Sequence, residues 1–392
     1  MRILQFNLAY APAWSHGGPP RILFDYAKTL VARGHEVTVF TSDTFDVNTR
    51  IPNRTSNLDG VQIHYFPNLS NYLAWHRRRY IPIGFFSAIR NRLREFDVVH
   101  VSETRSYGHA IISRYLNAWN VPYIYSGFGS LPRRSDGIKT IYDPLFVTPL
   151  LKGARSLLAQ TEHEAQEYVK YGGSQDRVSI LPLAVDPAQI GEAPPRDVFR
   201  KRFEIPDDAH LLLFLGRLHA SKGVVTLLEL FDAARKQDPL LHLAIVGRDD
   251  GNVEEIVQTI KDRGLQESVT LTGPLYDQDR FIAYSGADLF VFAPAIWEET
   301  SLASLEALAC GTLVLASRRA DIPWLEAYQA GRIWEPDDHQ SFIDWVSEFF
   351  TQPPEHRASM KLNAKQLINE KFVLTRVVDD LENKLLSATH SG

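Results

Sequence analysis

The chain has 392 residues, a length that suits two domains of ordinary size, each with its own core. Apolar residues make up 44% and the formal net charge is −5, so nucleic acid is not an expected partner. The single cysteine, Cys310, excludes an intramolecular disulfide, argues against a cysteine-based metal site and fits a reducing compartment.

The start of the chain lacks the form of a secretory signal, because Gln5 and Asn7 interrupt the apolar run that follows Met1. No apolar run approaches the roughly 20 residues that span a bilayer. We therefore expect a cytoplasmic protein, in which any membrane contact is peripheral and at the inner face of the membrane.

Strands and helices alternate in the first half of the chain. Residues 3–8 are predicted to form a strand, residues 21–33 a helix, and residues 36–41 a second strand. This strand–helix–strand order favours a parallel sheet. Further strands are predicted at 61–66, 98–101, 123–125, 156–159 and 178–181.

The same alternation restarts after residues 186–197, a segment rich in Pro and Ala that we interpret as a linker. Two successive open parallel sheets predict an α/β protein with two Rossmann-like lobes. Ligands are then expected at the carboxyl ends of the strands, in a central cleft between the lobes. In the second half we predict strands at 211–215, 241–246, 269–272, 289–292 and 313–316, and helices at 224–236, 253–263, 280–284 and 302–309.

Two cations follow the first strand of the second half. Gly216 and Arg217 come directly after the strand, and Lys222 follows five residues later, just before a helix. Both cations can converge on one anionic group, helped by backbone N–H groups at the helix start. A diphosphate leaving group needs such neutralisation in the transition state. The alternative, of equal weight for this segment alone, is a solvated loop with two surface cations.

Two carboxylates lie seven residues apart further along the chain. Glu298 is in the loop after a strand, and Glu306 is in the helix that follows. The helix start at Thr300, Ser301 and Leu302 is a natural seat for phosphate, since its N–H groups lack intrahelical partners and hydroxyls lie beside them. Glu306 could accept hydrogen bonds from a ribose diol. The alternative is that both glutamates are surface charges compatible with a helix.

Two other strands end in glycine, where the backbone can approach a flat ligand closely. Gly247 follows the strand at 241–246, and Gly273 precedes Pro274 and Leu275. Individually, these are generic features of α/β sheets.

Together, in this order and spacing, these segments resemble the retaining glycosyltransferases of the GT-B fold, specifically family 4, the glycosyl transferases group 1. The resemblance covers nearly the whole chain and is strongest over 211–317, which also contains the Ala-Asp-Leu-Phe-Val run at 287–291. It implies a retaining transferase that moves a sugar from a nucleoside-diphosphate sugar to a glycan or lipid-linked acceptor, in polysaccharide or glycolipid biosynthesis.

The resemblance also implies a domain organisation. Residues 1–187 would form the acceptor-binding domain and residues 188–372 the donor-binding domain. The last segment, 373–392, would carry a helix at about 374–386 that packs back towards the N-terminal domain.

Roles for individual residues follow from the same resemblance. Arg217 and Lys222 would bind the donor diphosphate, Glu306 the ribose, and Glu298 would lie near the hydroxyls of the donor sugar. Arg217, Lys222 and Glu298 are therefore the catalytic candidates. Backbone around 300–302 would contact the donor phosphate or sugar.

Neither a cofactor nor a metal is expected, and the donor, a UDP- or GDP-sugar, is a substrate. Asp277 and Asp279 have the Asp-x-Asp spacing of metal-dependent transferases, but we interpret them as a helix cap. Asp249 and Asp250 lie in a turn before Gly251 and are interpreted as a loop feature.

The N-terminal half matches the family less closely. Gly17 and Gly18, after the first strand, resemble the family's glycine loop, which approaches the donor phosphates or the acceptor; an ordinary turn is the alternative. Phe128 stands where many relatives carry a His beside the reacting sugar. Retaining members are thought to use the donor's own phosphate oxygen to deprotonate the acceptor, so the missing His need not abolish catalysis.

Candidates for contact with the acceptor, or for lining the cleft, are His16, His100, Glu103 and Phe128. For the histidines, including His109, an ordinary structural role is the favoured interpretation.

Residues 73–96 are basic and aromatic, with six Arg and a single acidic residue. An interfacial segment on anionic lipid has this mixture. Trp75, Arg77, Arg78 and Arg79 are therefore candidates for docking on an anionic membrane. A solvated basic helix face is an equal alternative.

Two other functions stay open. One is a related GT-B enzyme, such as a sugar-nucleotide epimerase or a phosphorylase, although the sequence shows no lysine context for pyridoxal. The other is a non-catalytic module that binds a nucleotide sugar. Phe128 mildly favours such a module, whereas the intact set of Arg217, Lys222, Glu298 and Glu306 disfavours it.

Overall fold

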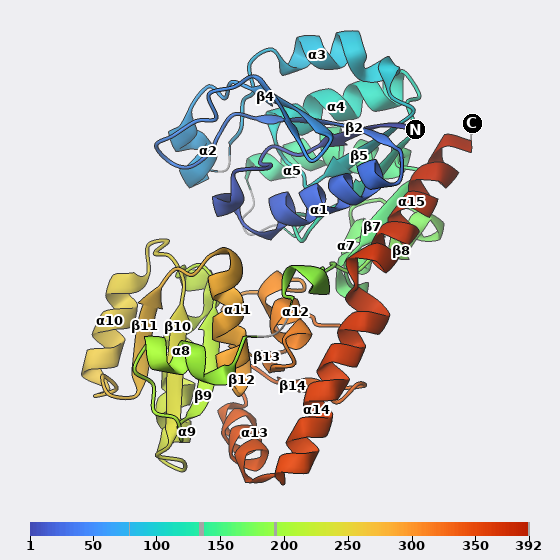
Figure 1. The fold of residues 1–392 in the computed structure, drawn as a ribbon. Helices are drawn as coiled ribbons and strands as arrows, with labels where there is room; N and C mark the ends of the chain where they lie inside the picture. Colours follow the sequence, from blue (N-terminus) through green and yellow to red (C-terminus); the bar gives the residue numbers. More distant parts are fainter. Residues whose placement is uncertain (78, 133–136, 192–193, 391–392) are drawn as a thin grey trace. The chain divides into compact units, whose positions relative to one another are not determined.

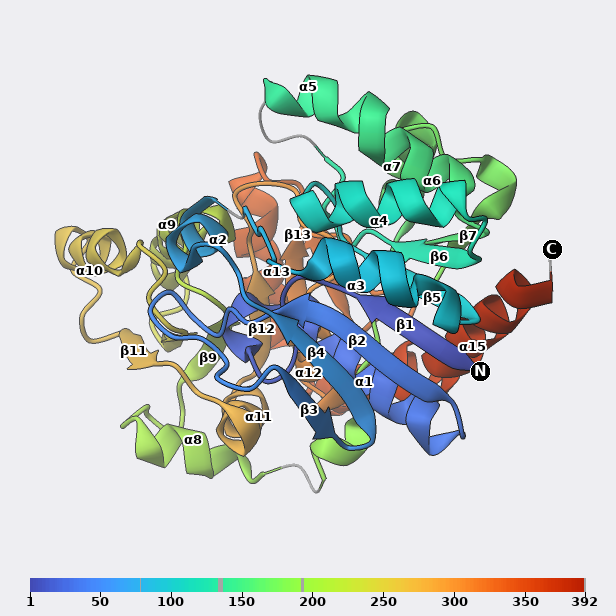
Figure 2. The ribbon, with the colours of Figure 1, turned by 90° about the horizontal axis from the view of Figure 1, so that it is seen from above.

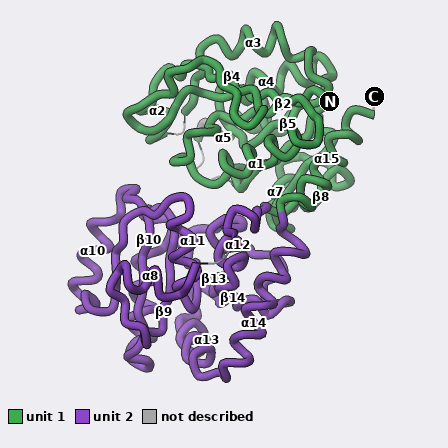
Figure 3. Tube along the Cα trace, in the orientation of Figure 1, with its two compact units in different colours: residues 1–183, 374–392 green, residues 184–373 purple. Residues whose placement is uncertain are grey.

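The computed structural model describes residues 1–77, 79–132, 137–191 and 194–390 (Figure 1). Arg78, one of the membrane candidates, lies outside the described residues. The chain divides into two compact units (Figure 3). Unit 1 comprises residues 1–183 and 374–392, and unit 2 comprises residues 184–373. The first division thus falls four residues before the predicted boundary at 187.

Unit 1 contains an eight-stranded sheet in the order β3-β4-β2-β1-β5-β6-β7-β8, in which every strand pair except β3–β4 is parallel. The strands are β1 (Arg2–Phe6), β2 (Glu36–Ser42), β3 (Thr55–Leu58), β4 (Val61–Phe66), β5 (Val98–Ser102), β6 (Tyr123–Ser126), β7 (Ser156–Ala159) and β8 (Val178–Ile180).

The edge strand β3 was not predicted. Its sequence Thr-Ser-Asn-Leu is polar and carries no apolar alternation, so the periodicity argument passed over it. The stronger signal was the turn: Asp59 and Gly60 both have positive φ, at 50° and 84°, as a tight hairpin requires. This hairpin makes the sheet mixed at one edge.

The helices of unit 1 pack on both faces of this sheet, with α3 and α4 on one face and α1 and α15 on the other (Figure 2). They are α1 (Gly18–Ala32), α2 (Asn71–Arg77), α3 (Phe85–Arg92), α4 (Tyr107–Ala118), α5 (Ile138–Tyr142), α6 (Thr148–Gly153), α7 (Glu162–Lys170) and α15 (Leu374–His390). Helix α1 begins three residues before its predicted start, because Pro19 and Pro20 fit the first turn, where an N–H is not needed.

The last helix, α15, belongs to unit 1 and packs on α1. Arg33 and His35, just after α1, hold it through Glu382: Arg33 Nη1 lies 2.7 Å from Glu382 Oε2, and His35 Nε2 lies 2.7 Å from Oε1. The helix runs to His390, four residues beyond its predicted end.

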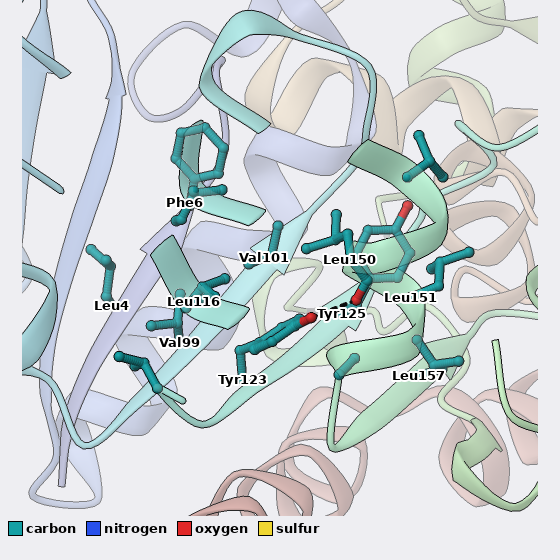
Figure 4. Close-up of a cluster of buried hydrophobic side chains, with 14 of the residues drawn as sticks. Leu4, Phe6, Val99, Val101, Leu116, Tyr123, Tyr125, Leu150, Leu151 and Leu157 are labelled. Carbon is teal, nitrogen blue, oxygen red and sulfur yellow. Dashed lines mark hydrogen bonds between the residues drawn. The ribbon is translucent and has the colours of Figure 1, made fainter. Parts of the chain in front are cut away.

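Residues of five neighbouring strands, β2, β1, β5, β6 and β7, build the core under α3, α4 and α6, part of which is drawn in Figure 4. Inside this core the hydroxyl of Tyr123, on β6, donates a hydrogen bond to the carbonyl of Leu150, on α6, at 2.6 Å. The apolar residues labelled there are Leu4, Phe6, Val99, Val101, Leu116, Leu150, Leu151 and Leu157.

Unit 2 contains a six-stranded parallel sheet in the order β11-β10-β9-β12-β13-β14. Numbered along the chain, this is the Rossmann order 3-2-1-4-5-6, whose topological switch point lies between β9 and β12. The strands are β9 (His210–Leu215), β10 (Leu241–Val246), β11 (Val269–Gly273), β12 (Leu289–Phe292), β13 (Leu313–Ser317) and β14 (Gly331–Trp334). Its helices are α8 (Arg196–Arg202), α9 (Val224–Arg235), α10 (Val253–Asp262), α11 (Asp277–Gly286), α12 (Leu302–Ala309), α13 (His339–Thr351) and α14 (Pro354–Leu367).

Two predictions need correction in unit 2. The supposed linker at 186–197 contains a 3-10 turn at Pro187–Gln189, and α8 begins at Arg196. Helix α11 is twice as long as predicted and starts at Asp277 with Tyr276 as its N-cap, so Asp277 and Asp279 lie in its first turn and are not a cap. Asp279 pairs with Arg202 at 3.0 Å.

Candidate functional site

The loops after β9 and β12 meet at the switch point of the unit 2 sheet, the place where open α/β sheets bind ligands. Gly223 permits their close approach: its φ is +68°, and a Cβ there would lie 1.9 Å from the Ala293 carbonyl oxygen. The Ala295 N–H also donates to the Ser221 carbonyl at 2.9 Å. These backbone contacts fix the end of the first loop, where Lys222 lies.

Lys222 and Glu298 form an ion pair across the two loops, with 2.6 Å between Nζ and Oε2. Both side chains are largely buried, with 18% and 16% of their surface exposed. The backbone N–H of Glu298 donates to the Arg319 carbonyl at 2.8 Å, so the loop after β13 holds this carboxylate in place. An ammonium group has three donors, so Lys222 can bind a phosphate oxygen while it keeps Glu298.

Arg217 has a carboxylate partner too, Asp250, in the loop after β10. The interpretation of Asp250 as a mere loop feature was therefore incomplete. Asp249 does have a local role: its carboxylate accepts from the N–H groups of Gly251 and Asn252, bonds that lower the pKa of Asp249. The two cations predicted to bind phosphate are thus each compensated by an acid.

Gly216 and Gly247 allow the ends of two neighbouring strands to pack closely. A Cβ on Gly247 would lie 1.8 Å from the Gly216 carbonyl oxygen, so only glycine lets the ends of β9 and β10 come together. The next strand end joins the same array, since the Gly247 N–H donates to the Gly273 carbonyl at 3.1 Å. Pro274 and Leu275 then lead into α11.

Helix α12 begins at Leu302, as predicted, with Ser301 as an N-cap whose side chain makes no capping hydrogen bond. The N–H groups of its first turn lack intrahelical acceptors. Thr300 differs from expectation, because its hydroxyl donates to the Asp321 carbonyl at 2.7 Å and only 6% of the residue is exposed. Its backbone, and not its hydroxyl, remains the candidate for ligand contact.

Glu306 is held by two residues of α11 that the sequence interpretation missed. Arg280 Nε donates to Oε1 and the Tyr284 hydroxyl donates to Oε2, each at 3.0 Å. Burial, with the nearby Glu306 charge, raises the pKa of Tyr284 well above its usual range, so its hydroxyl stays protonated as a donor. The available signal was the spacing: residues four apart share a helix face.

In unit 1, the candidates from the first loop lie at the start of α1. Gly17 is its N-cap and Gly18 its first residue. His16 Nδ1 lies 3.1 Å from the Tyr80 hydroxyl, and its ring packs edge-on against Trp75 with centroids 4.9 Å apart. His16, a candidate for acceptor contact, is therefore in direct contact with Trp75, a candidate for membrane docking.

The other candidates of this unit lie near the end of β5 and β6. His100 is buried in the sheet with its Nε2 2.8 Å from the Ser126 hydroxyl, and burial lowers its pKa to about 4. The burial and the low pKa of His100 favour a structural role over contact with a ligand. The N–H of Glu103 donates to the Ser126 carbonyl, and Phe128 is half-buried in the loop after β6.

Glu164 organises the Phe128 loop, a role that the sequence interpretation missed. This carboxylate is 1% exposed and accepts from the N–H groups of Gly129 and Gln160, at 2.7 Å and 2.8 Å. Such hydrogen bonds to a buried carboxylate are the strong kind. The backbone next to Phe128 is therefore held in place by the carboxylate of Glu164.

The basic region divides into exposed and engaged side chains. Arg77 and Arg79 are exposed. Arg92 instead donates to Glu95 at 3.1 Å, and Arg94 stacks over Trp119 at 4.3 Å. Nearby apolar side chains also reach solvent: Tyr72, Ile83 and Phe86.

No helix in the described ranges is long and apolar enough to cross a membrane. Those ranges also hold no cluster of three or more His, Cys, Asp or Glu side chains that could bind a metal ion.

Comparison with known families gives matches in both halves. Residues 195–367 match the family described as Glycosyl transferases group 1, and residues 16–189 match Glycosyltransferase Family 4. D-inositol 3-phosphate glycosyltransferase of Nocardiopsis dassonvillei is 24% identical over 376 residues, which span 88% of this chain and 86% of the relative. The enzyme of that name from Pseudarthrobacter chlorophenolicus is 32% identical over 204 residues, spanning 51% of this chain and 48% of that protein.

Solved structures share the fold. Sucrose-phosphate synthase of Thermosynechococcus elongatus superposes with a TM-score of 0.77 at 18% identity, covering 99% of this chain and all of that one. HepE of Anabaena, in complex with UDP and glucose, has a TM-score of 0.75 at 16% identity and similar coverage, 99% and 100%.

Proposed function

Because the chain belongs to the group 1 glycosyltransferases of the GT-B fold, we propose that it transfers a sugar, with retention, from a nucleoside-diphosphate sugar bound in unit 2. The observation that carries this proposal is the pairing of Lys222 with Glu298 at the switch point, beside the start of α12. The pair brings a phosphate-binding cation and a hydroxyl-binding carboxylate to one place.

In this proposal the bond between the anomeric carbon and the β-phosphate oxygen breaks, and a bond to the acceptor oxygen forms on the same face. The acceptor proton passes to the departing phosphate. Lys222, Arg217 and the N–H groups at the start of α12 neutralise the growing charge on the diphosphate. Glu298 orients a sugar hydroxyl, and Glu306 the ribose.

We propose a glycan or lipid-linked acceptor, bound by unit 1. The exposed arginines and apolar side chains around α2 and α3 support an acceptor at a lipid surface. A phosphorylated polyol is a second candidate acceptor, because several relatives are named D-inositol 3-phosphate glycosyltransferases.

A panel of UDP- and GDP-sugars tests the proposed function. Purified protein is incubated with each donor and a mixture of glycan, lipid-linked and polyol phosphate acceptors, and mass spectrometry follows the release of nucleoside diphosphate and the mass of the product. One donor should give a product heavier than its acceptor by one sugar residue, and the anomeric proton coupling should show retention. Epimerised donor, sugar phosphate, or bound donor without product would instead assign the alternative functions.

Glu306→Gln is expected to weaken donor binding about tenfold, since hydrogen bonds to a charged group contribute about 1.5–3 kcal/mol. Its kcat should change little, because the ribose contact is the same in the ground and transition states. Tyr284→Phe, which removes one of the two hydrogen bonds that position Glu306, should raise KM in the same way but less. Steady-state kinetics with the true donor measure both. A fall in kcat at unchanged KM would contradict this role for Glu306.

Turnover is expected to persist in excess chelator, because Arg217 and Lys222 supply the positive charge that a divalent metal supplies elsewhere. The assay is sugar transfer with and without EDTA after removal of bound metal. Loss of activity in EDTA that Mg²⁺ or Mn²⁺ restores would overturn this expectation.

Binding to anionic vesicles is expected to fall when Arg77 and Arg79 are replaced together by alanine, and to fall as salt rises, since exposed charges are screened. Co-sedimentation with vesicles of anionic lipid measures this. The matched control removes two exposed cations of unit 2, Lys201 and Lys236, whose side chains are 70% and 74% exposed. Equal loss in both variants would show that net charge alone is responsible.

A further inference from the structure

A basic cavity in unit 1 is lined by residues at β7, at β8 and on the final helix α15. These three elements lie near one another in Figure 1. Its volume is about 160 Å³, and its lining includes three cationic side chains, Arg155, Arg177 and Lys384. They come from three separate parts of the chain: the start of β7, the turn before β8, and α15. The fold itself therefore brings the cations together.

Two of these cations lack a compensating acid. Among the described residues, the side chains of Arg155 and Lys384 make no ion pair, and both are half-buried. Arg177 is fixed from behind, because its Nη1 donates to the Lys152 and Ala154 carbonyls at 3.0 Å and 3.1 Å. Within the described chain its Nε and Nη2 make no hydrogen bond, so one edge of a rigid guanidinium can serve a ligand.

Ser179, which also lines the cavity, adds a second observation. Ser179 Oγ, on β8, is buried and has no hydrogen-bond partner in the described part of the protein. A buried polar atom without a partner costs about 1–3 kcal/mol, and a hydrogen bond from Ser179 to a bound oxygen would remove that cost.

The cavity is separate from the proposed catalytic site. Ser156 and Val178, which line it, are the first residues of β7 and β8, so it opens at the amino ends of the strands. Substrates of such sheets bind at the opposite, carboxyl ends. Ligand binding in this cavity is therefore independent of the transferase activity.

We propose that this cavity binds a phosphate group, as inorganic phosphate or a phosphomonoester, through Arg155, Arg177, Lys384 and the Ser179 hydroxyl. A phosphomonoester carries about −1.5 to −2 charges at neutral pH and offers three acceptor oxygens, which matches this set of donors. The size agrees, because sites for whole drug-sized or cofactor ligands occupy about 300–1,000 Å³. A nucleotide sugar would therefore not fit, whereas a single tetrahedral anion does.

Asp176 is the one carboxylate in the lining, and it supplies a test with the opposite sign. Hydrogen bonding from Ser174 lowers the pKa of Asp176, so it is ionised at neutral pH and repels an anion. Asp176→Asn should therefore tighten phosphate binding, whereas loss of a cation should weaken it.

The experiment is calorimetric titration of the full chain with inorganic phosphate and with glycerol 3-phosphate at low ionic strength. Every protein used in this titration also carries Arg217→Ala and Lys222→Ala, so that phosphate does not bind at the proposed donor site. Lys384→Ala and Arg155→Ala should each weaken binding about tenfold or more, as expected for the loss of a charge-assisted hydrogen bond. Arg90→Ala, an exposed arginine on α3, is the control and should change nothing.

Two sources of the phosphate group are separated by a second arm, co-sedimentation with phosphatidic acid vesicles. Binding of free phosphate that depends on Lys384 assigns a soluble ligand. Vesicle binding that depends on Lys384, without binding of free phosphate, assigns a lipid headgroup. Binding that is unchanged by all three substitutions in the cavity, in both arms, would overturn the proposal. Failure here leaves the donor site intact, because sugar transfer by the otherwise native chain is measured separately.

Discussion

Lys222→Ala is expected to lower kcat by about 10²–10³, equivalent to about 2.7–4 kcal/mol of barrier. The leaving diphosphate gains negative charge as the glycosidic bond breaks, so a preorganised cation stabilises the transition state more than the ground state. Loss of Lys222 also leaves Glu298, whose side chain is only 16% exposed, without its partner beside the phosphates. Arg217→Ala should act in the same direction.

The pairing seen in the structure suggests a sharper version of this experiment. If Lys222 served only to neutralise Glu298, the double variant Lys222→Ala with Glu298→Gln would be as active as Glu298→Gln alone. If Lys222 binds the diphosphate, the double variant should be much slower than Glu298→Gln and at least as slow as Lys222→Ala. A double-mutant cycle in kcat and KM separates the two roles. Lys236→Ala, an exposed cation at the end of α9, is the control, and near wild-type rates for Lys222→Ala in folded protein would contradict the site assignment.

Asp288→Ala is expected to destabilise unit 2 by about 3–5 kcal/mol, because it leaves a buried cation unpaired. Arg200 is 1% exposed and its Nη2 donates to Asp288 at 2.9 Å. Asp288 also accepts the Leu211 N–H at 2.9 Å, at the start of β9. Burial lowers the pKa of Arg200, and the negative charge of Asp288 acts in the opposite direction by favouring the charged guanidinium. The Asp of the Ala-Asp-Leu-Phe-Val run thus joins α8, β9 and β12.

Urea unfolding, followed by hydrogen exchange in β9 and β12, measures this loss in unit 2 itself. The control is Asp197→Ala on the same helix α8: its pair with Lys201 is exposed, and such pairs contribute about 0–1 kcal/mol. Equal losses in the two variants would show that the buried pair has no special structural role.

The sequence predicted five of the six strands of unit 2, because each of the five is a short, largely apolar run between turns, and such runs are local signals. It missed β14, whose sequence Gly-Arg-Ile-Trp is too short and too polar to give that signal. The strands 241–246 and 289–292 have the predicted bounds. It did not predict the pairing of Lys222 with Glu298, whose positions are 76 residues apart. That contact depends on which strands become neighbours at the switch point, and periodicity carries no such information.

The same reason explains the other omissions. Asp250 lies in a turn, as predicted, and Arg280 lies in the first half of a helix that was predicted to start at Arg280 but starts at Asp277. Their partners, Arg217 and Glu306, come from other strands or helices. Strand β3 was missed because its residues are polar, although the Asp-Gly turn beside it was a usable signal.

Hydrogen–deuterium exchange with bound nucleotide tests the location of the donor site most directly. UDP and GDP are added separately to the wild-type chain and to Lys222→Ala, and peptides across both units are followed. One nucleotide should slow exchange at residues 216–224 and at residues 298–306 in the wild type, and much less in the variant. Protection confined to unit 1, or equal protection in the variant, would contradict a donor site at the switch point of the six-stranded sheet.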